Sequence, residues 1–423
     1  MKNLFYLLLS ISLFSCDIVV DTLVDSVDTS NVETTIETGP FVIDSFMWVD
    51  SNYKISYPKH LFLKNHKVII PTSEKLIALD AQTGELVWEQ KSGPNVTDYD
   101  HYPIEYKNDV YYSEDHKLWK LDQSNGDLIE IKDFTQFENS YIHGVTIVDD
   151  IIYFTTSNSL CDSNYFVNFY RIPLDGASRN DFTPYWSVTT ENFNGLKSGF
   201  SNPTIVQNQQ GDDLAVFHML LSNPKDSWID SLNTSQVDAI LAYNITQKKE
   251  EWYNFNVAPY YSHLEMHGNK LFTYGSEGLT HLNFNTGETI WKTNIEEFWE
   301  GIDKTQLIFK ENTIYAITGQ SNAYSLDINS GQINWVADLD IYHNGKKGSA
   351  YLHNSKIVYI NGWGMLNIID QKNGKAETYH LPREVYASGT KDVISSFNSM
   401  VLDGNTVIAS DKNSIMAFDI SNK

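Results

Sequence analysis

Residues 76–90 read LIALDAQTGELVWEQ, and this stretch decides the fold because its pattern returns along the chain. Its first half alternates apolar and other residues as a β-strand does, and Asp80 ends that strand. Thr83 and Gly84 form a tight turn, and a second strand runs out through Trp88. The best copies are LNFNTGETIWK at 282–292 and LDINSGQINWV at 326–336, in which a Gly follows the Asp or Asn by four residues and a Trp follows it by eight. The pattern predicts a repeated strand–turn–strand unit.

Each marked position of the unit has a physical reason. The Gly supplies the positive φ angle that a short hairpin turn needs, and the Asp or Asn side chain can bond the turn backbone. The Trp falls in the outer strand, where a large flat side chain packs between adjacent sheets and buries much of its roughly 150–250 Å². The sequence therefore assigns these Trp residues to packing rather than to ligand stacking.

The combination A-x-D-x-x-T-G-x-x-x-W resembles the repeat of the pyrroloquinoline-quinone (PQQ) type β-propellers, and its copies span nearly the whole chain after the leader. The resemblance implies a propeller fold. It implies no single activity, because the family includes quinone-dependent dehydrogenases and also propellers that hold no cofactor.

The number of repeats predicts the number of blades. We expect an all-β, eight-bladed β-propeller of four-stranded antiparallel blades over residues 40–423. The strand at 41–49 carries Trp48 but no preceding turn motif, whereas 415–423 has the motif Asp and no outer strand after it. The N-terminal strand is therefore predicted to close the last blade beside the C-terminal strands. The eight motif positions are Asp80, Asp122, Asp175, Asn244, Asn283, Asp327, Asp370 and Asp419.

The third and fourth blades carry insertions, at 156–166 and at 222–237, because the motif spacing widens there. Both insertions connect a second strand to a third strand. In a four-stranded antiparallel blade these connections share one face with the links between blades, so we expect both insertions on that link face.

The N-terminal 39 residues are predicted to lie outside the propeller. Residues 1–15 have one Lys and a short apolar core, which is typical of an export signal. Leu13 to Cys16 is similar to the lipobox of bacterial lipoproteins, which implies lipidation of Cys16 and a stable membrane anchor; an ordinary secretory leader is the alternative. Residues 16–39 are acidic and lack aromatic residues, so they are predicted to be a flexible tether. Asp21-Thr22-Leu23 and Asp25-Ser26-Val27 look like acceptor sites for O-glycosylation, on weak grounds.

The charge balance is strongly acidic. Asp and Glu total 54 against 30 for Lys and Arg, which gives a formal net charge of −24. Such a surface repels nucleic acid and anionic lipid. We therefore expect no nucleic-acid partner.

The links between blades are rich in aromatic and acidic residues. Exposed aromatic residues among charges often carry the binding energy for a partner, although link aromatics can also simply cap the blade ends. Both interpretations stay open. The candidate partner-binding rim consists of Tyr99, Trp228, Tyr260, Tyr261, Phe298, Trp299 and Tyr342.

Alignment on the turn after the innermost strand brings polar residues to one equivalent position near the central funnel. The three histidines in this ring suggest a metal, but they belong to blades one, three and five, which is too far apart for a shared ion at about 2.0–2.1 Å. We expect no metal and a hydrated funnel lining. The ring comprises His60, Tyr102, His143, His263, Gln306, Ser349 and Ser399.

One strand of the fifth blade departs from its siblings. Glu265 stands where Phe62, Ile104 and Val145 stand in other blades, and it shares a strand face with His263 and His267. Burial raises the pKa of a carboxyl group unless a histidine pairs with it. The group is thus either a structural ion pair or part of a small funnel site.

The function classes can be ranked from these observations. The quinone dehydrogenases of the resembled family have a vicinal Cys pair and a calcium site, whereas this chain has only Cys16 and Cys161 and no recognised calcium loop. We therefore expect no catalysis and no cofactor. The architecture is similar to that of the propeller lipoproteins of the outer-membrane β-barrel assembly machine, which implies a monomeric scaffold for envelope proteins, anchored by lipid in the bacterial cell envelope, with the outer membrane favoured. A surface glycan-binding lipoprotein and a quinone-dependent dehydrogenase-like enzyme are the alternatives.

Overall fold

The computed structural model describes most of the propeller region and nothing before residue 41. The described residues are 41–42, 46–52, 61–72, 74–94, 103–114, 116–137, 141–158, 166–175, 182–189, 197–201, 203–222, 237–255, 263–275, 278–295, 306–318, 322–337, 339, 346–361, 365–380, 399–410 and 414–422. The predicted leader, Cys16 and the tether fall outside them.

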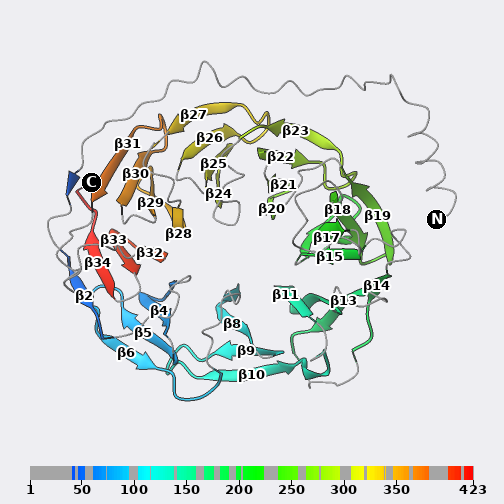
Figure 1. The fold of residues 1–423 in the computed structure, drawn as a ribbon, viewed down its shortest axis with the longest axis horizontal. Coiled ribbons are helices and arrows are strands. Elements are labelled where there is room, and N and C mark those ends of the chain that lie inside the picture. The colour runs from blue at the N-terminus through cyan, green and yellow to red at the C-terminus, as the bar shows by residue number, and fades with distance from the viewer. Residues whose placement is uncertain are drawn as a thin grey trace.

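Eight antiparallel sheets follow one another around a ring, as the repeat count predicts (Figure 1). Within each blade, the strands follow one another in chain order from the inner to the outer edge of the sheet. Blade 1 contains β3 (Phe62–Lys64), β4 (Lys67–Pro71), β5 (Leu76–Asp80) and β6 (Leu86–Glu89); blade 2 contains β7 (Ile104–Tyr106), β8 (Asp109–Glu114), β9 (Lys117–Leu121) and β10 (Leu128–Asp133); blade 3 contains β11 (Tyr141–Val148), β12 (Ile151–Ser157), β13 (Phe166–Pro173) and β14 (Trp186–Thr189); blade 4 contains β15 (Lys197–Phe200), β16 (Thr204–Gln207), β17 (Asp213–Ser222), β18 (Val237–Asn244) and β19 (Lys249–Asn254).

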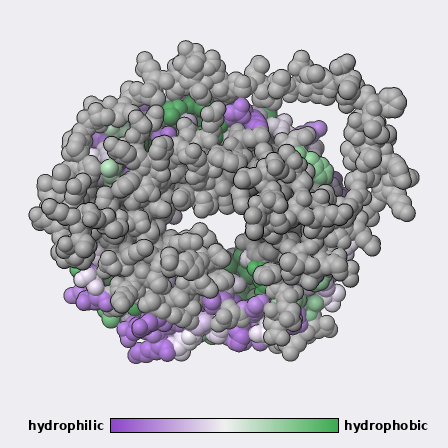
Figure 2. Space-filling model, in the orientation of Figure 1, coloured by the Kyte–Doolittle hydropathy of each residue, from purple (hydrophilic) through white to green (hydrophobic). Residues whose placement is uncertain are grey.

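The last four blades complete the ring. Blade 5 contains β20 (His263–His267), β21 (Lys270–Gly275), β22 (Gly278–Leu282) and β23 (Thr289–Thr293); blade 6 contains β24 (Gln306–Lys310), β25 (Thr313–Ile317), β26 (Ala323–Asp327) and β27 (Ile333–Ala337); blade 7 contains β28 (Lys346–His353), β29 (Lys356–Asn361), β30 (Met365–Asp370) and β31 (Ala376–His380); blade 8 contains β32 (Ser399–Asp403), β33 (Thr406–Ser410) and β34 (Ile415–Asp419). The space-filling view shows an opening at the centre of the ring (Figure 2).

The N-terminal segment closes blade 8, as predicted. β2 (Trp48–Asp50) pairs antiparallel with β34, in a register that sets Trp48 opposite Ala417. The preceding piece differs from the prediction, because β1 (Phe41–Val42) pairs in parallel with β31 of blade 7. The outer strand of blade 7 presents a bare edge that the chain covers before it reaches blade 8.

Other departures are local. The inner position of blade 4 is filled by two short strands, β15 and β16, which both pair with β17. The helix found in the described part is a single 3-10 turn, η1 (Thr135–Phe137), and no described helix is long and apolar enough to cross a membrane.

The motif turns have the predicted geometry. In blade 1, the Asp80 carboxylate accepts hydrogen bonds from the backbone N–H groups of Gln82 (3.0 Å) and Thr83 (2.9 Å). Gly84 has a φ of 74° and donates its N–H to the Asp80 carbonyl oxygen at 2.9 Å. The Asp caps the turn while the Gly allows it to close.

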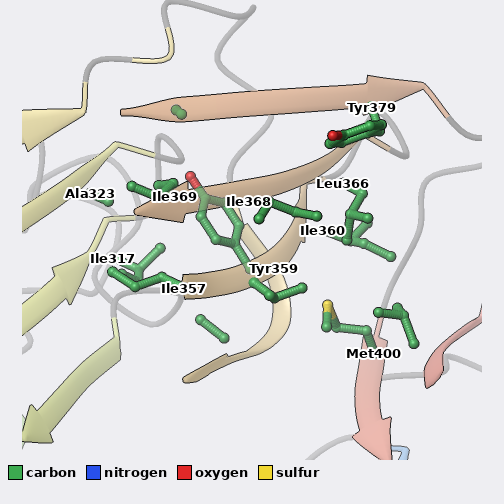
Figure 3. Packing of buried hydrophobic residues seen from close by; sticks show 14 of the residues in the cluster. Ile317, Ala323, Ile357, Tyr359, Ile360, Leu366, Ile368, Ile369, Tyr379 and Met400 are labelled. Atoms are coloured by element: carbon green, nitrogen blue, oxygen red, sulfur yellow. The ribbon is translucent and has the colours of Figure 1, made fainter. Parts of the chain in front are cut away.

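The core lies between the sheets rather than at one centre. Its largest cluster joins three consecutive blades, with Ile317 of blade 6, Tyr359 of blade 7 and Met400 of blade 8 among its members (Figure 3). Stability of the ring therefore depends on each blade-to-blade junction.

Five of the junctions carry the same aromatic lock. The indole of the outer-strand Trp lies over the motif Gly of the next blade, and its Nε1 donates to the backbone carbonyl of the residue after the motif Asp or Asn. For Trp88 this hydrogen bond reaches the Gln123 oxygen at 3.1 Å. The Trp–Gly locks are Trp48–Gly84, Trp88–Gly126, Trp252–Gly287, Trp291–Gly331 and Trp335–Gly374.

The junction between blades 2 and 3 uses a different device. Glu130 occupies the position of the Trp, and its carboxylate pairs with Lys117 at 2.7 Å. Phe134 and Phe137, which follow β10, pack instead on Phe154 (5.0 Å between ring centroids) and on Tyr170 (4.9 Å).

Candidate functional site

The predicted partner-binding rim cannot be placed from the described residues. Its seven members, Tyr99, Trp228, Tyr260, Tyr261, Phe298, Trp299 and Tyr342, lie outside them, as does Cys16. The assignment of these residues stays a prediction.

The described strands do fix which face these segments leave from. Each link runs from the outer strand of one blade to the inner strand of the next, and strands alternate in direction within each sheet. The long connection between β12 and β13 and the one between β17 and β18 each join a second strand to a third. Both therefore leave the sheets on the link face, as the sequence predicts.

Two members of the predicted polar ring make hydrogen bonds to the neighbouring blade. The Gln306 side chain donates from Nε2 to the Ala350 carbonyl (3.1 Å) and accepts from the Ala350 N–H (2.7 Å). Ser399 Oγ accepts from the Leu61 N–H at 3.0 Å. These contacts join blade 6 to blade 7 and blade 8 to blade 1.

For four other members of the ring, the side chains lie outside the described part of the structure. His60 and Tyr102 lie outside the described residues, while the backbones of His143 and His263 lie in β11 and β20. Among the described residues, no group of three His, Cys, Asp or Glu side chains is placed to hold a metal ion.

Glu265 lies partly buried on β20, in a row that crosses all four strands of blade 5. Directly opposite residues in this row are Glu265, Phe272, His281 and Trp291. The row faces blade 6, because Phe272 and Trp291 pack in one cluster with Leu307 and Ile314 of that blade. Glu265 thus sits at the inner end of the junction between blades 5 and 6.

The electrostatics of this row follow from burial. Burial raises the pKa of Glu265 to about 7. His267 stacks its ring on Phe309, with 4.7 Å between centroids, and makes no hydrogen bond to Glu265 in the described structure. No ion pair joins Glu265 to His267, and the side chain of His263, the other candidate partner, lies outside the described residues. Burial therefore favours the protonated form of the Glu265 carboxyl group.

His281 lies in the same row, although no pattern in the sequence singled it out as a candidate site residue. It is only 4% exposed, stacks on Phe272 (4.9 Å) and meets Trp291 edge-on (5.6 Å). Burial lowers its pKa to about 4, so the ring is neutral at physiological pH. One feature of the sequence could have identified it. His281 stands two residues before Asn283, and the equivalent residues in three other blades are Ala78, Ala242 and Ala417.

The fold and its repeated Asp, Gly and Trp positions define the class: a PQQ-type repeat β-propeller. A family model described as "Outer membrane protein assembly factor BamB" matches residues 58–159 and 230–423. The chain belongs to this family. No curated protein sequence is similar enough to count as a match.

Solved structures with the same fold differ widely in what they are. A quinohemoprotein alcohol dehydrogenase from Pseudomonas putida aligns with a TM-score of 0.57 at 10% identity, covering 90% of this chain and 76% of that one. The computationally designed protein Ika8 aligns with a TM-score of 0.52 at 11% identity, covering 87% and 98%. Saccharomyces cerevisiae Sqt1 aligns with a TM-score of 0.51 at 11% identity, covering 88% and 98%. These similarities show the fold alone.

Proposed function

We propose that this protein is a non-catalytic scaffold of the bacterial cell envelope that binds protein partners through its link face. Lipid on Cys16 anchors it, with residues 16–39 as the tether, and the outer membrane is the favoured location. The observation that carries the proposal is the family match over residues 58–159 and 230–423, since the matched family is described as an outer membrane protein assembly factor.

The geometry supports the link face as the binding surface. In the described residues, the motif-turn face carries tight hairpin turns, in which the Gly N–H donates to the backbone carbonyl of the motif Asp or Asn. The two long connections leave the sheets on the opposite, link face. Long connections on a rigid scaffold are where binding residues concentrate.

A quinone-dependent dehydrogenase fits the chain poorly, although one shares its fold. The two cysteines, Cys16 and Cys161, are far apart in the sequence, so the chain cannot form a vicinal Cys pair. A thermal-shift measurement with added quinone and calcium tests this alternative, and stabilisation by both together would favour an enzyme.

A capture experiment tests the scaffold proposal. The full chain and a form lacking residues 223–236 are used to capture partners from detergent-solubilised envelope. A second variant replaces Tyr260, Tyr261, Phe298 and Trp299 with Ser. We expect both changes to weaken capture of a defined envelope protein, because both remove residues that are predicted to lie on the link face.

The matched control removes exposed apolar side chains elsewhere. Leu86, Val87 and Ile290 lie exposed on outer strands, and replacing them with Ser should leave capture unchanged. Equal capture by all variants would contradict a link-face binding site. Glycan-array binding that is lost in the aromatic variant would support the glycan alternative instead.

A further inference from the structure

The junction between blades 3 and 4 carries a run of aromatic side chains, here called the aromatic seam. From blade 3, Trp186 of β14 stacks on Tyr243 of blade 4, with 4.7 Å between ring centroids. From blade 4, Tyr253 of β19 packs against the apolar cluster at the same junction. Phe255 in turn stacks on Tyr253, at 5.9 Å and with the ring planes 7° apart. The seam consists of Tyr185, Trp186, Tyr243, Tyr253 and Phe255.

Phe255 is the member of the seam that faces solvent. It is 48% exposed, and it is the single aromatic residue among the large apolar residues that lie exposed in the described part of the chain. It follows directly on β19, at the end where the link to blade 5 begins. Stacking on Tyr253 holds one side of its ring, and the exposed remainder is available for contact with another molecule.

The other end of the seam already contains a cation–π contact. Lys248 of blade 4 places its Nζ 5.0 Å from the centroid of the Tyr185 ring. A Lys or Arg cation within about 6 Å of an aromatic ring centroid is attracted by the electrons of the ring. Among the described residues, no Lys or Arg is placed in this way over Tyr253 or Phe255. The end with the exposed ring therefore receives no cation from the described part of the chain.

A carboxylate lies beside the rings at this end. Glu250 is half-buried and stands opposite Tyr243 in the pairing of β18 with β19. Burial, and then the nearby charge of Glu250, raise the pKa of the Tyr253 hydroxyl. The neighbouring Lys249 pairs with Glu251 instead, at 3.4 Å, and no Lys or Arg of the described residues forms an ion pair with Glu250. A carboxylate without a cationic partner thus lies next to the aromatic rings.

The charge of the whole molecule favours the same kind of partner. With a formal net charge of −24, the protein attracts a basic segment before contact and repels an acidic one. At the seam, such a segment meets both a ring for its cation and a carboxylate for an ion pair. A neutral apolar segment would gain from the ring but would leave the carboxylate unused.

We propose that the link-face end of the aromatic seam binds a basic segment of a protein partner through its Lys or Arg side chains. One cationic side chain stacks on the exposed ring of Phe255, and a second pairs with Glu250. The inference rests on the proposed scaffold function for the existence of a protein partner, and it adds the chemistry that the partner presents.

Binding of a basic peptide to the full chain tests this assignment. The probe is a fluorescein-labelled peptide in which Arg alternates with Ser, and anisotropy is measured at about 0.15 M salt, where charges beyond about 8 Å are screened. Phe255→Ala and Glu250→Gln should each weaken its binding about two- to fivefold, because each removes one exposed contact with a cation. A peptide with neutral citrulline in place of Arg should bind more weakly and should not respond to either variant.

Matched controls make the same changes on blade 5. Ile290 of β23 is also 48% exposed, so Ile290→Ala removes an equally exposed apolar side chain. Glu288→Gln removes an exposed carboxylate just before the same strand. Neither control should change the affinity for the Arg peptide.

Two results would overturn the assignment. Either Phe255→Ala and Glu250→Gln leave the affinity unchanged, or the blade 5 controls weaken binding equally, in which case net charge alone attracts the peptide. Capture of envelope proteins is a separate measurement. Loss of capture with the seam still binding the peptide would contradict the scaffold proposal and leave the chemistry of this site in place.

Discussion

Gly331 illustrates that the glycine of the repeat has two separate requirements. Its φ of 72° favours Gly for the turn, as the sequence indicates. In addition, a Cβ at this position would lie 2.5 Å from Cε3 of Trp291 and 2.7 Å from Thr293 Oγ1. The indole of Trp291 from the neighbouring blade therefore packs directly against this glycine, where a side chain would clash with it.

Replacement of this residue should be costly for both reasons. Gly331→Ala combines a left-handed backbone with overpacking of a buried indole, so we expect a loss of about 2–4 kcal/mol in the free energy of unfolding. Gly268 is the matched control, because it has a φ of 58° but nothing within 4 Å of an added Cβ. Gly268→Ala should cost only the backbone part, about 1–2 kcal/mol. Urea unfolding measures both, and equal losses would contradict the packing role.

Glu265 should make the junction between blades 5 and 6 sensitive to pH. Its folded pKa of about 7 lies above 4.5, the usual value for a glutamate side chain. Protonation therefore stabilises the fold fully below about pH 4.5, and this contribution is lost as pH rises through 7. Glu265→Gln should accordingly stabilise the protein at pH 8, by about 1–3 kcal/mol, and change little at pH 5.

Urea unfolding at the two pH values checks this prediction. Glu311→Gln, on an exposed turn of the next blade, makes the same change of charge without burial. If Glu311→Gln produces the same pH-dependent gain, net charge rather than the buried carboxyl explains the effect.

Single residues were predictable where they repeat. The Asp, Gly and Trp positions follow from turn and packing chemistry, and Glu265 stood out because its equivalents are apolar. His281 was missed because a buried neutral imidazole has no pattern of its own in the sequence. Its stacking between Phe272 and Trp291 depends on cross-strand register, which only the folded sheet provides.

At the scale of elements, the junction between blades 3 and 4 shows how a lock can change partners. Trp186 is the first Trp after the motif Asp175. The Tyr185 hydroxyl nevertheless donates to the Ile245 carbonyl at 2.6 Å, the oxygen equivalent to the one that Trp Nε1 reaches at the Trp–Gly locks. Lys248 takes the place of the motif Gly with a φ of 57°, and its Nζ lies 5.0 Å from the Tyr185 ring centroid. Trp186 stacks on Tyr243 instead, at 4.7 Å.

Removing that hydroxyl tests the substitution of one lock for another. Tyr185→Phe should cost about 1–2 kcal/mol, because the Ile245 carbonyl loses its donor. Lys248→Gly relieves the left-handed backbone and should be neutral or stabilising. Thermal unfolding of both variants measures this, and an unchanged midpoint for Tyr185→Phe would exclude the hydrogen bond as a lock.

The elements themselves were predictable to different degrees. Eight four-stranded sheets and the closing strand follow from the spacing of the motif. β1, the split inner strand of blade 4 and η1 do not, because they are short and settle where an edge or a gap is left by other elements. β1 in particular is only two residues long and is defined by its parallel pairing with β31.

For the whole molecule, ring closure distributes stability over many similar turns. Hydrogen bonds from the turn lower the pKa of the motif carboxyl in blades 1, 2 and 8: from the Thr83 backbone to Asp80, from the Ser124 side chain to Asp122, and from the Ser421 side chain to Asp419. A lowered carboxyl pKa contributes stability above its unfolded value, near pH 4, and that contribution is lost as pH falls through the folded pKa. The ring should therefore lose stability in acid by small steps from several blades at once.

Asparagine provides the means to test this, because Asn283 already fills the same position in blade 5. Its amide oxygen accepts the Asn285 N–H at 3.0 Å. A triple variant, Asp80→Asn, Asp122→Asn and Asp419→Asn, keeps an acceptor that does not titrate, so its urea midpoint should fall less between pH 6 and pH 3 than that of the natural chain. A second triple variant, Glu85→Gln, Glu288→Gln and Glu311→Gln, changes the net charge equally at exposed positions. Suppose that the urea midpoint of this control falls as little between pH 6 and pH 3 as that of the Asp→Asn variant. In that case, relief of the repulsion among 54 acidic residues accounts for the effect, and the hydrogen bonds to the motif carboxylates do not.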